Sequence, residues 1–412
     1  VTVAVVLAGS YAFVLNGHVT GIAIPAIAAD LGHDSALGID WVVTTFLVGV
    51  VLVLPVTGWL AESFGRPRVI TSALALFAVG CLICMAAPTL EVLLVGRFFQ
   101  GFGGGVLLPL GMASVYDALP PERRGKALGV WGVAMTVAPA AGPPVGGLVV
   151  AVAHWRWLFI GFFVVAVVAS VLTHRLIPDG GDRAFRRLDV AAWGLASAGV
   201  ASIVVGAREV NAWGLTSMRS LAAVVIAAIT LPAFAIRTHR SSRPLIDVGM
   251  YRVPTFAIAM AVISAVGVAQ FARINLVPVE LQVVRSLPPE RVGLLLVPAA
   301  LGIAITMPLG GWLVDRFGAR LPVTIGACFA ALGSLLIARL SFDGPVVDVI
   351  VAVIAQGVGN GLMIVPSTIA ALNSLPRQFV SQASGVNELT RQLSGALGVA
   401  VLSAIIVGRL GS

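Results

Sequence analysis

The chain has 412 residues, of which 58% are hydrophobic and 11% are charged, and its formal net charge is +8 at pH 7. Soluble proteins carry about 25% charged residues, and a water-soluble fold of this size has too little interior to hide so many apolar side chains. The composition therefore excludes a soluble protein and indicates a polytopic membrane protein. The apolar stretches are of helix-spanning length and lack period-2 alternation, which excludes the strands of a membrane barrel.

Thirteen apolar stretches follow one another along the chain. We expect spans at residues 3–29, 37–61, 69–88, 91–115, 127–152, 157–177, 190–207, 220–237, 254–284, 292–314, 321–341, 345–372 and 385–408. Loops on one side carry sixteen Lys and Arg residues and those on the other carry seven. By the positive-inside rule, this asymmetry places the N-terminus in the cytoplasm. We expect a multi-pass protein of the cell inner membrane. Because the basic residues are spread over short loops, no nucleic-acid partner is expected. The expected partner is the lipid bilayer.

An internal repeat predicts the architecture. The segment from Gly58 to Gly65 recurs from Gly311 to Gly318, and Gln100-Gly-x-Gly recurs as Gln356-Gly-x-Gly. Two parallel halves are typical of secondary transporters, which bind substrate between the halves. We predict an N-terminal six-span half at 1–178, a linker with two extra spans at 179–252 and a C-terminal half at 253–412. This second half has five spans, so a last span is expected to be missing from the chain, and the alternative is a protein with thirteen spans.

The repeated loop carries the first family resemblance. Gly58, Glu62, Gly65, Arg66 and Arg68 lie in a pattern that resembles the signature between spans two and three of the major facilitator superfamily. The second copy holds Asp315 and Arg316. Glycines allow close backbone approach, and the charged groups can bind helix termini or lipid headgroups. The resemblance implies a conformational latch that does not contact substrate.

Arg97 is the first charged residue inside an expected span. The run from Arg97 to Gly103 resembles the superfamily's fourth-span signature, in which this arginine is linked to proton coupling. A guanidinium in a membrane is costly without an acceptor, so an intramembrane arginine indicates a functional role. The alternative is that the side chain extends to the outer surface.

Small residues are spaced regularly along the fifth span. They follow the superfamily pattern that marks exporters, with Ala138 replacing one glycine, and comprise Gly129, Gly142, Pro143, Gly146 and Gly147. Small side chains favour close helix packing, and proline bends a helix. A bent, smooth helix suits an interface that opens and closes. The alternative is a generic packing face.

Several short fragments narrow the resemblance. The segments are Trp155 to Phe159, Pro244 to Asp247, Leu281-Gln282 and Ser384 to Leu393. Together they are similar to the fourteen-span drug:proton antiporters of the major facilitator superfamily. The resemblance implies a major facilitator fold with a two-span insertion, a proton as the coupling ion and no cofactor.

The first span departs from that family. Asn16 stands where the family usually has an aspartate, so the role of that acid does not transfer. His18 is a candidate replacement because its ordinary pKa is near 6.5, although a lone histidine is more often a packing residue. Glu388 and Arg391 share a helix face and can pair, either for coupling or as a static ion pair. Glu280, near Arg273 by seven-residue spacing, is the remaining proton-coupling candidate.

Polar side chains within apolar spans are the candidate cavity groups. An apolar cavity with few polar groups suits varied lipophilic substrates. The candidates are Asn16, Gln100, Gln270, Asn275, Gln282, Asn360, Asn387 and Gln392.

The sequence as a whole favours a proton-coupled efflux antiporter of lipophilic drugs or related amphiphiles, working by alternating access as a monomer. One alternative is an exporter of a lipid, sugar or amino-acid metabolite in the same fold, and another is a membrane sensor that does not transport. The motifs of intramembrane or nucleotide-hydrolysing enzymes and metal-binding histidine pairs are not found, so neither enzymatic activity nor a metal is expected.

Overall fold

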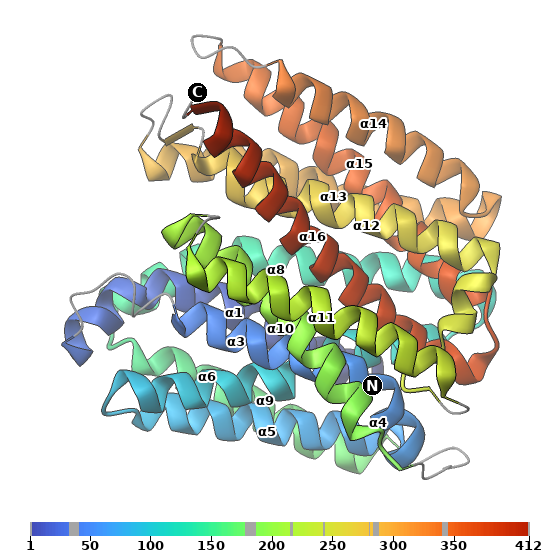
Figure 1. Ribbon diagram of the computed structural model, residues 1–412, viewed down its shortest axis with the longest axis horizontal. Coiled ribbons are helices and arrows are strands. Elements are labelled where there is room, and N and C mark those ends of the chain that lie inside the picture. The colour runs from blue at the N-terminus through green and yellow to red at the C-terminus, as the bar shows by residue number, and fades with distance from the viewer. Residues whose placement is uncertain are drawn as a thin grey trace. The chain divides into compact units, whose positions relative to one another are not determined.

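The computed structural model describes residues 2–32, 41–177, 187–214, 217–241, 244–279, 281–282, 288–339 and 345–410. Within these ranges every regular element is a helix (Figure 1). Among the described residues, ten helical segments are long and apolar enough to cross a membrane, and α8 (Arg124–Val152), which is bent, raises the number to eleven. The predicted all-helical fold is confirmed.

The helices follow the predicted spans with small shifts. In the first part of the chain they are α1 (Thr2–Leu31), α3 (Trp41–Val53), η1 (Leu54–Val56), α4 (Thr57–Phe64), α5 (Arg66–Ala86), α6 (Leu90–Gly105), α7 (Leu107–Asp117), η2 (Pro121–Arg123), α8 and α9 (Arg156–Leu176). The predicted spans 37–61 and 91–115 correspond to the continuous spans Trp41–Phe64 and Leu90–Asp117, the first with a short 3-10 break at Leu54–Val56 and the second with a single turn residue at Val106. The break at η1 contains Pro55, which has no backbone N–H to continue the α-helical ladder.

The remaining helices complete the series. They are α10 (Val190–Trp213), α11 (Met218–Arg240), η3 (Val248–Arg252), α12 (Pro254–Val279), α13 (Pro289–Phe317), α14 (Arg320–Ala338), α15 (Val346–Asn373), η5 (Arg377–Phe379) and α16 (Val380–Leu410). The last helix begins five residues before the predicted start at 385, and α12 ends before the predicted 284.

The chain forms two compact units, each made of three segments. Unit 1 contains Val1–Ser114, Ala138–Val248 and Arg377–Leu389, and unit 2 contains Val115–Val137, Gly249–Pro376 and Thr390–Ser412. In unit 1, α5 packs between α6 and α9, and α3 packs on α6. In unit 2, α15 packs on both α13 and α14. Both α8 and α16 contribute one part to each unit.

The two inserted helices α10 and α11 pack on each other, and α10 packs on α3. Trp193 Nε1 donates a 2.8 Å hydrogen bond to the carbonyl oxygen of Leu52, and Ser197 Oγ donates to the same oxygen at 3.2 Å. Leu52 is in the last turn of α3, just before Pro55 interrupts the helix. The insertion thus provides hydrogen-bond donors at the break between α3 and α4.

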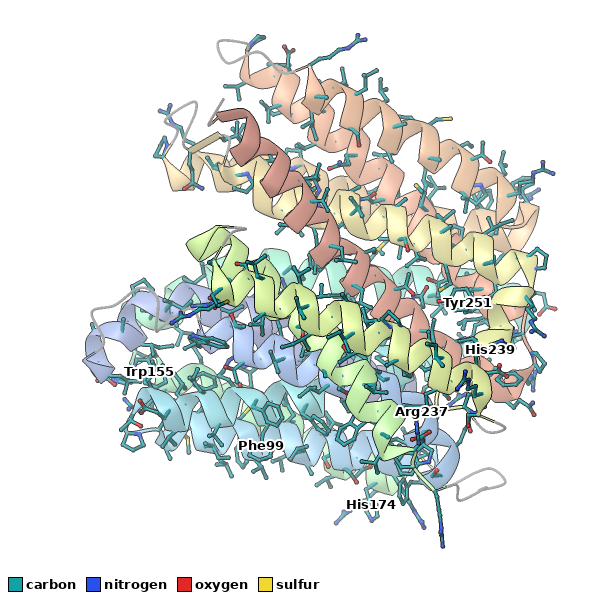
Figure 2. The ribbon with its side chains drawn as sticks, in the orientation of Figure 1. Phe99, Trp155, His174, Arg237, His239 and Tyr251 are labelled. Carbon is teal, nitrogen blue, oxygen red and sulfur yellow. The ribbon has the colours of Figure 1, made fainter. Side chains whose placement is uncertain are left out.

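The start of α10 is fixed by an ion pair. Asp189 precedes the helix, accepts from the backbone N–H of Ala192 at 2.9 Å and binds Arg237 of α11, whose Nη2 lies 2.9 Å from Asp189 Oδ1. Figure 2 shows Arg237 near the end of α11. The hydrogen bond from Arg237 lowers the pKa of the Asp189 carboxyl below its ordinary value. The pair ties the two ends of the insertion together.

Candidate functional site

A buried polar cluster surrounds Arg97 in unit 1. The Arg97 side chain is 0% exposed, so it does not extend to a surface. Its Nη1 donates to Asn16 Oδ1 at 2.7 Å and to Gln100 Oε1 at 2.8 Å, and its Nε donates to the carbonyl oxygen of Val42 at 3.2 Å. The guanidinium lies over the Phe46 ring, 4.3 Å from the centroid. Three helices, α1, α3 and α6, therefore meet at one cation.

Two buried thiols extend this cluster towards α5. Gln100 Nε2 lies 3.0 Å from Cys81 Sγ, and Cys84 Sγ lies 3.7 Å from Gln100 Oε1. Both cysteines are reduced and buried. Gln100 thus links Arg97 to α5, and both cysteines are part of the packed interior.

Glycines around the cluster bring the helices into close contact. A Cβ on Gly101 would clash with the carbonyl oxygen of Phe46, and one on Gly80 would lie 2.6 Å from the backbone nitrogen of Gln100. Only a residue without a side chain fits where backbones approach so closely. These contacts set the distance from Arg97 to α3 and α5.

The first-span candidates occupy different environments. Asn16 is 0% exposed and bonded to Arg97, whereas the His18 side chain is exposed and its Nδ1 lies 2.9 Å from the carbonyl oxygen of Val14. Thr20 Oγ1 donates to the carbonyl oxygen of Asn16 at 2.8 Å. The structure brings Asn16, Arg97 and Gln100 together and leaves His18 outside the cluster.

The small residues of α8 contact two different helices. In unit 1, a Cβ on Gly142 would lie 2.8 Å from His18 Cβ, and one on Gly146 would lie 3.1 Å from the carbonyl oxygen of Val19. In unit 2, a Cβ on Gly129 would lie 2.7 Å from Pro308 Cα of α13. A Cβ on Gly147 would meet no neighbouring atom within 4 Å. Gly142 and Gly146 therefore allow α8 to pack directly on α1.

The first loop motif contacts the start of α16 within unit 1. Gly65 has φ +85°, a conformation that favours glycine, and it separates α4 from α5. Arg66 Nε donates to Ser381 Oγ at 2.7 Å, and its Nη1 lies 3.4 Å from the carbonyl oxygen of Ala113. A Cβ on Gly58 would lie 2.9 Å from Gln382 Cα. Of the other predicted motif residues, Glu62 is partly buried and Arg68 is exposed.

The second loop motif caps α8 within unit 2. Asp315 accepts from the backbone N–H groups of Gly125 and Lys126 at 2.8 and 2.9 Å, near the N-terminus of α8. A carboxylate at this place accepts hydrogen bonds from free backbone N–H groups and interacts favourably with the positive end of the helix dipole. Gly318 repeats the positive φ of the first loop, at +77°. Arg316 is exposed and its guanidinium carbon lies 5.7 Å from the centroid of the Trp312 ring.

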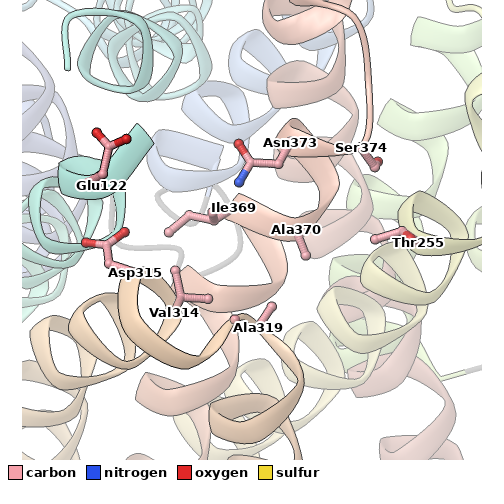
Figure 3. A pocket seen from close by; sticks show the side chains of 10 residues that line it. Glu122, Thr255, Val314, Asp315, Ala319, Ile369, Ala370, Asn373 and Ser374 are labelled. Atoms are coloured by element: carbon pink, nitrogen blue, oxygen red, sulfur yellow. The ribbon is translucent and has the colours of Figure 1, made fainter. Parts of the chain in front are cut away.

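A cavity of about 510 Å³ opens beside Asp315. Figure 3 shows Asp315 and Glu122 on one side of it and Asn373 and Ser374, at the end of α15, on the other. None of its described lining residues is a predicted cavity group. The cavity belongs to the loop ends of the helices, and we do not assign substrate to it.

The remaining candidates lie on α12, α15 and α16. Arg391 Nη1 donates to Gln270 Oε1 at 3.0 Å in unit 2. Glu388 is 8% exposed and belongs to unit 1. Asn360 is 0% exposed and Asn387 is 6% exposed.

The last three cavity candidates and Glu280 are not all among the described side chains. Gln392 is partly buried and Gln282 is exposed. Glu280 and the side chain of Asn275 lie outside the described residues.

The turn between α8 and α9 is fixed to the end of α1. Asp30 accepts from Trp155 Nε1 at 3.1 Å and from Arg156 Nη1 at 2.6 Å. Arg156 Nη2 also donates to the carbonyl oxygen of Ala87 at 2.7 Å. Trp155 is 2% exposed and lies at this turn (Figure 2). The tryptophan-arginine fragment found in the sequence is therefore a structural clamp among α1, α5 and α9.

Sequence reasoning missed several partners of the candidate site. Phe46, Val42 and Cys81 surround Arg97 and Gln100, and Ser381 binds Arg66. A phenylalanine or valine in an apolar span has no feature that distinguishes it from ordinary packing. The cysteines were visible as residues but not as partners of Gln100, because this pairing depends on how α5 and α6 pack.

Comparison with known proteins places this geometry in a family. The model of the Major Facilitator Superfamily matches residues 5–399. The chain belongs to that superfamily. It is 29% identical to the multidrug resistance protein Stp of Mycobacterium tuberculosis, over 98% of this chain and 75% of the relative. It is also 29% identical to the MFS-type transporter YhcA of Bacillus subtilis, over 98% of this chain and 76% of the relative.

Solved structures show the same fold. The proton:xylose symporter XylE, bound to 6-bromo-6-deoxy-D-glucose, matches with a TM-score of 0.66 at 14% identity, over 98% of this chain and 88% of that chain. The predicted membership of the superfamily and the predicted fold are confirmed. The chain is a multi-pass membrane transporter of the Major Facilitator Superfamily, whose family and fold are those of transporters and not of enzymes.

Proposed function

We propose that this transporter exports lipophilic drugs or related amphiphiles in exchange for protons. The observation that carries the proposal is the contact of α8 with α1, where Gly142 and Gly146 pack on the segment from His18 to Ile22. This is the part of the chain that resembles the exporter signature of the superfamily. Relatives named multidrug resistance proteins support the same direction of transport.

The proposed cycle uses alternating access in the cell inner membrane, with the N-terminus in the cytoplasm, by a monomer without cofactor. The proton is the coupling ion. In the described spans, the buried carboxylates are Glu209 and Glu388. Glu209 is bonded to Arg208, with 2.5 Å between Oε1 and Nη1. We take Glu388 as the candidate for the proton-binding group, as the sequence predicts, because it is a carboxylic acid that is only 8% exposed within α16.

The test is proton release by purified protein in weakly buffered detergent while lipophilic compounds are added. An antiporter releases protons when substrate binds, and Glu388→Gln abolishes the release. Glu91→Gln is the matched control, because it makes the same change at an exposed position of α6. Release that persists in Glu388→Gln moves the proton to His18 or Glu280.

Two further outcomes decide between the functions. Compound binding without proton exchange contradicts antiport and favours a uniporter or a sensor. Proteoliposomes that transport only a lipid, a sugar or an amino acid support the metabolite exporter in the same fold.

A further inference from the structure

The cluster around Arg97 contains donors without acceptors. Arg97 Nη2 and Asn16 Nδ2 are both fully buried and have no hydrogen-bond partner among the described residues. The two side chains are joined by the 2.7 Å bond from Arg97 Nη1 to Asn16 Oδ1, so these free donors belong to one site. A buried donor without a partner is costly, and native proteins retain few of them.

The positive charge in this site is not balanced. The described partners of Arg97 are an asparagine, a glutamine, a backbone carbonyl and a phenylalanine ring, all of which are neutral. The surroundings are aromatic, since the Phe13 ring lies 5.4 Å from Phe46 and 6.3 Å from Phe77, centroid to centroid. In such a medium an uncompensated cation strongly favours a negative partner.

We infer that Arg97 and Asn16 bind the anionic group of the substrate, so that the preferred cargo is an amphiphile bearing a carboxylate or similar oxyanion. This inference rests on the proposed export function and specifies its substrate class. Arg97 Nη2 and Asn16 Nδ2 supply two hydrogen bonds to oxygen, and the phenylalanines contact the apolar body. Because both side chains are fully buried, the anion reaches them in a conformation in which α1 separates from α3 and α6.

The chemistry of residue 16 decides the sign of the preferred charge. An aspartate there would accept from Arg97 and neutralise it, whereas asparagine accepts with one oxygen and presents an N–H donor to the site. A cationic ligand would meet the arginine and the free amide donor of Asn16. The same residue thus distinguishes anionic from cationic cargo.

The experiment measures binding of three matched probes to the transporter in lipid nanodiscs: 1-naphthaleneacetate, 1-naphthylacetamide and 1-naphthylmethylammonium. Wild type is expected to bind the acetate at least about tenfold more tightly than the amide, as for a hydrogen-bonded charge, and the ammonium most weakly. This comparison needs no variant to fold. It also reports on binding alone. A lack of preference among the probes can therefore occur together with proton exchange, and a preference can occur without proton exchange.

The variants assign the preference to the two residues. Arg97→Gln is expected to abolish the preference for the acetate, Arg97→Lys to retain part of it, and Asn16→Asp to weaken the acetate and strengthen the ammonium. Arg339→Gln, at an exposed position after α14, is the control for the loss of one positive charge. Equal binding of all three probes by wild type, or an acetate preference that survives Arg97→Gln, would overturn the inference.

Chloride is the second possible source of a negative partner. It is titrated into the protein without any naphthyl compound, and the shift in the unfolding midpoint is measured. Stabilisation by chloride that requires Arg97, together with no discrimination among the probes, overturns the assignment to substrate. Discrimination among the probes with chloride acting only as a competitor supports it.

Discussion

Helices α6 and α15 have the same packing and different chemistry. In α6, Gly101 abuts the backbone of α3 at Phe46 and Gly103 abuts α5. In α15, Gly357 abuts the backbone of α13 at Ala299 and Gly359 abuts α14. The glycines are thus used in the same way in both repeats, to bring three helices together.

The residue three positions before the shared glutamine differs. It is Arg97 in α6 and Val353 in α15, and both side chains are 0% exposed. Gln100 is bonded to Arg97, whereas Gln356 Nε2 has only a long 3.5 Å contact with Ser334 Oγ and its Oε1 has no partner in the described residues. The comparison teaches that the glycines preserve the helix packing, while the charged site has been placed in only one of the two repeats.

The strongest test of this comparison moves the charge. Val353→Arg places a cation in a site built for an apolar side chain, and we expect it to lower the free energy of unfolding by about 3 kcal/mol. Arg97→Met removes the cation from α6 but leaves the acceptors on Asn16, Gln100 and Val42 without their donor, so it should lower stability by less than Val353→Arg does, while transport is lost. Thermal unfolding in detergent, together with a transport assay, measures both. A Val353→Arg protein as stable as wild type would show that the two sites are interchangeable.

The shared glycines provide the next largest effect. Gly101→Ala forces a methyl group into the backbone of α3, and overpacking of this kind costs about 2 kcal/mol. Gly357→Ala should have a similar effect because its Cβ also meets backbone. Gly161→Ala is the control, since a Cβ there would meet no neighbouring atom within 4 Å. Unequal shifts in the unfolding midpoint for Gly101→Ala and Gly357→Ala would contradict equivalent packing.

The two loop motifs make different contacts, and only the second is described as a cap, at the start of α8. Asp315→Asn removes the charge that binds two backbone N–H groups at the start of α8, and we expect a loss of about 1 kcal/mol. Asp315→Glu retains the charge on a longer side chain and should lose less. The unfolding midpoint measures the loss. If Asp315→Asn has no effect, the cap does not stabilise α8.

The smallest expected effect is in the insertion, which has no counterpart elsewhere in the repeat. The lowered pKa of Asp189 means that its bond to Arg237 stabilises the folded chain above the ordinary aspartate pKa, and that this contribution is lost as the pH falls through the folded-state pKa. Because Arg237 is 47% exposed, solvent screening keeps it small.

Asp189→Asn should therefore lower the unfolding midpoint slightly at pH 7, and the difference from wild type should disappear as the pH falls below the folded-state pKa of Asp189. Unfolding curves across this pH range check it. A difference that does not change with pH would show that the charge of Asp189 is not what stabilises the turn.

From the sequence, the helices could be predicted more accurately than the contacts between them. Apolar length located the spans, because a membrane helix must satisfy every backbone group within itself, and so its signal lies in one continuous segment. Arg97 was identified because a charge in an apolar span is conspicuous, but its neutral partners were not.

By itself, the sequence determined the membrane environment, the helical fold, the repeat and the family. Each of these depends on composition or on spacing along one segment. Only the tertiary structure decided that Asn16 and Gln100 bind Arg97 while His18 does not, that Asp315 caps α8 and that Gly142 packs on α1. These contacts join residues far apart in the chain, and their existence depends on which helix faces meet, a property that no local pattern carries.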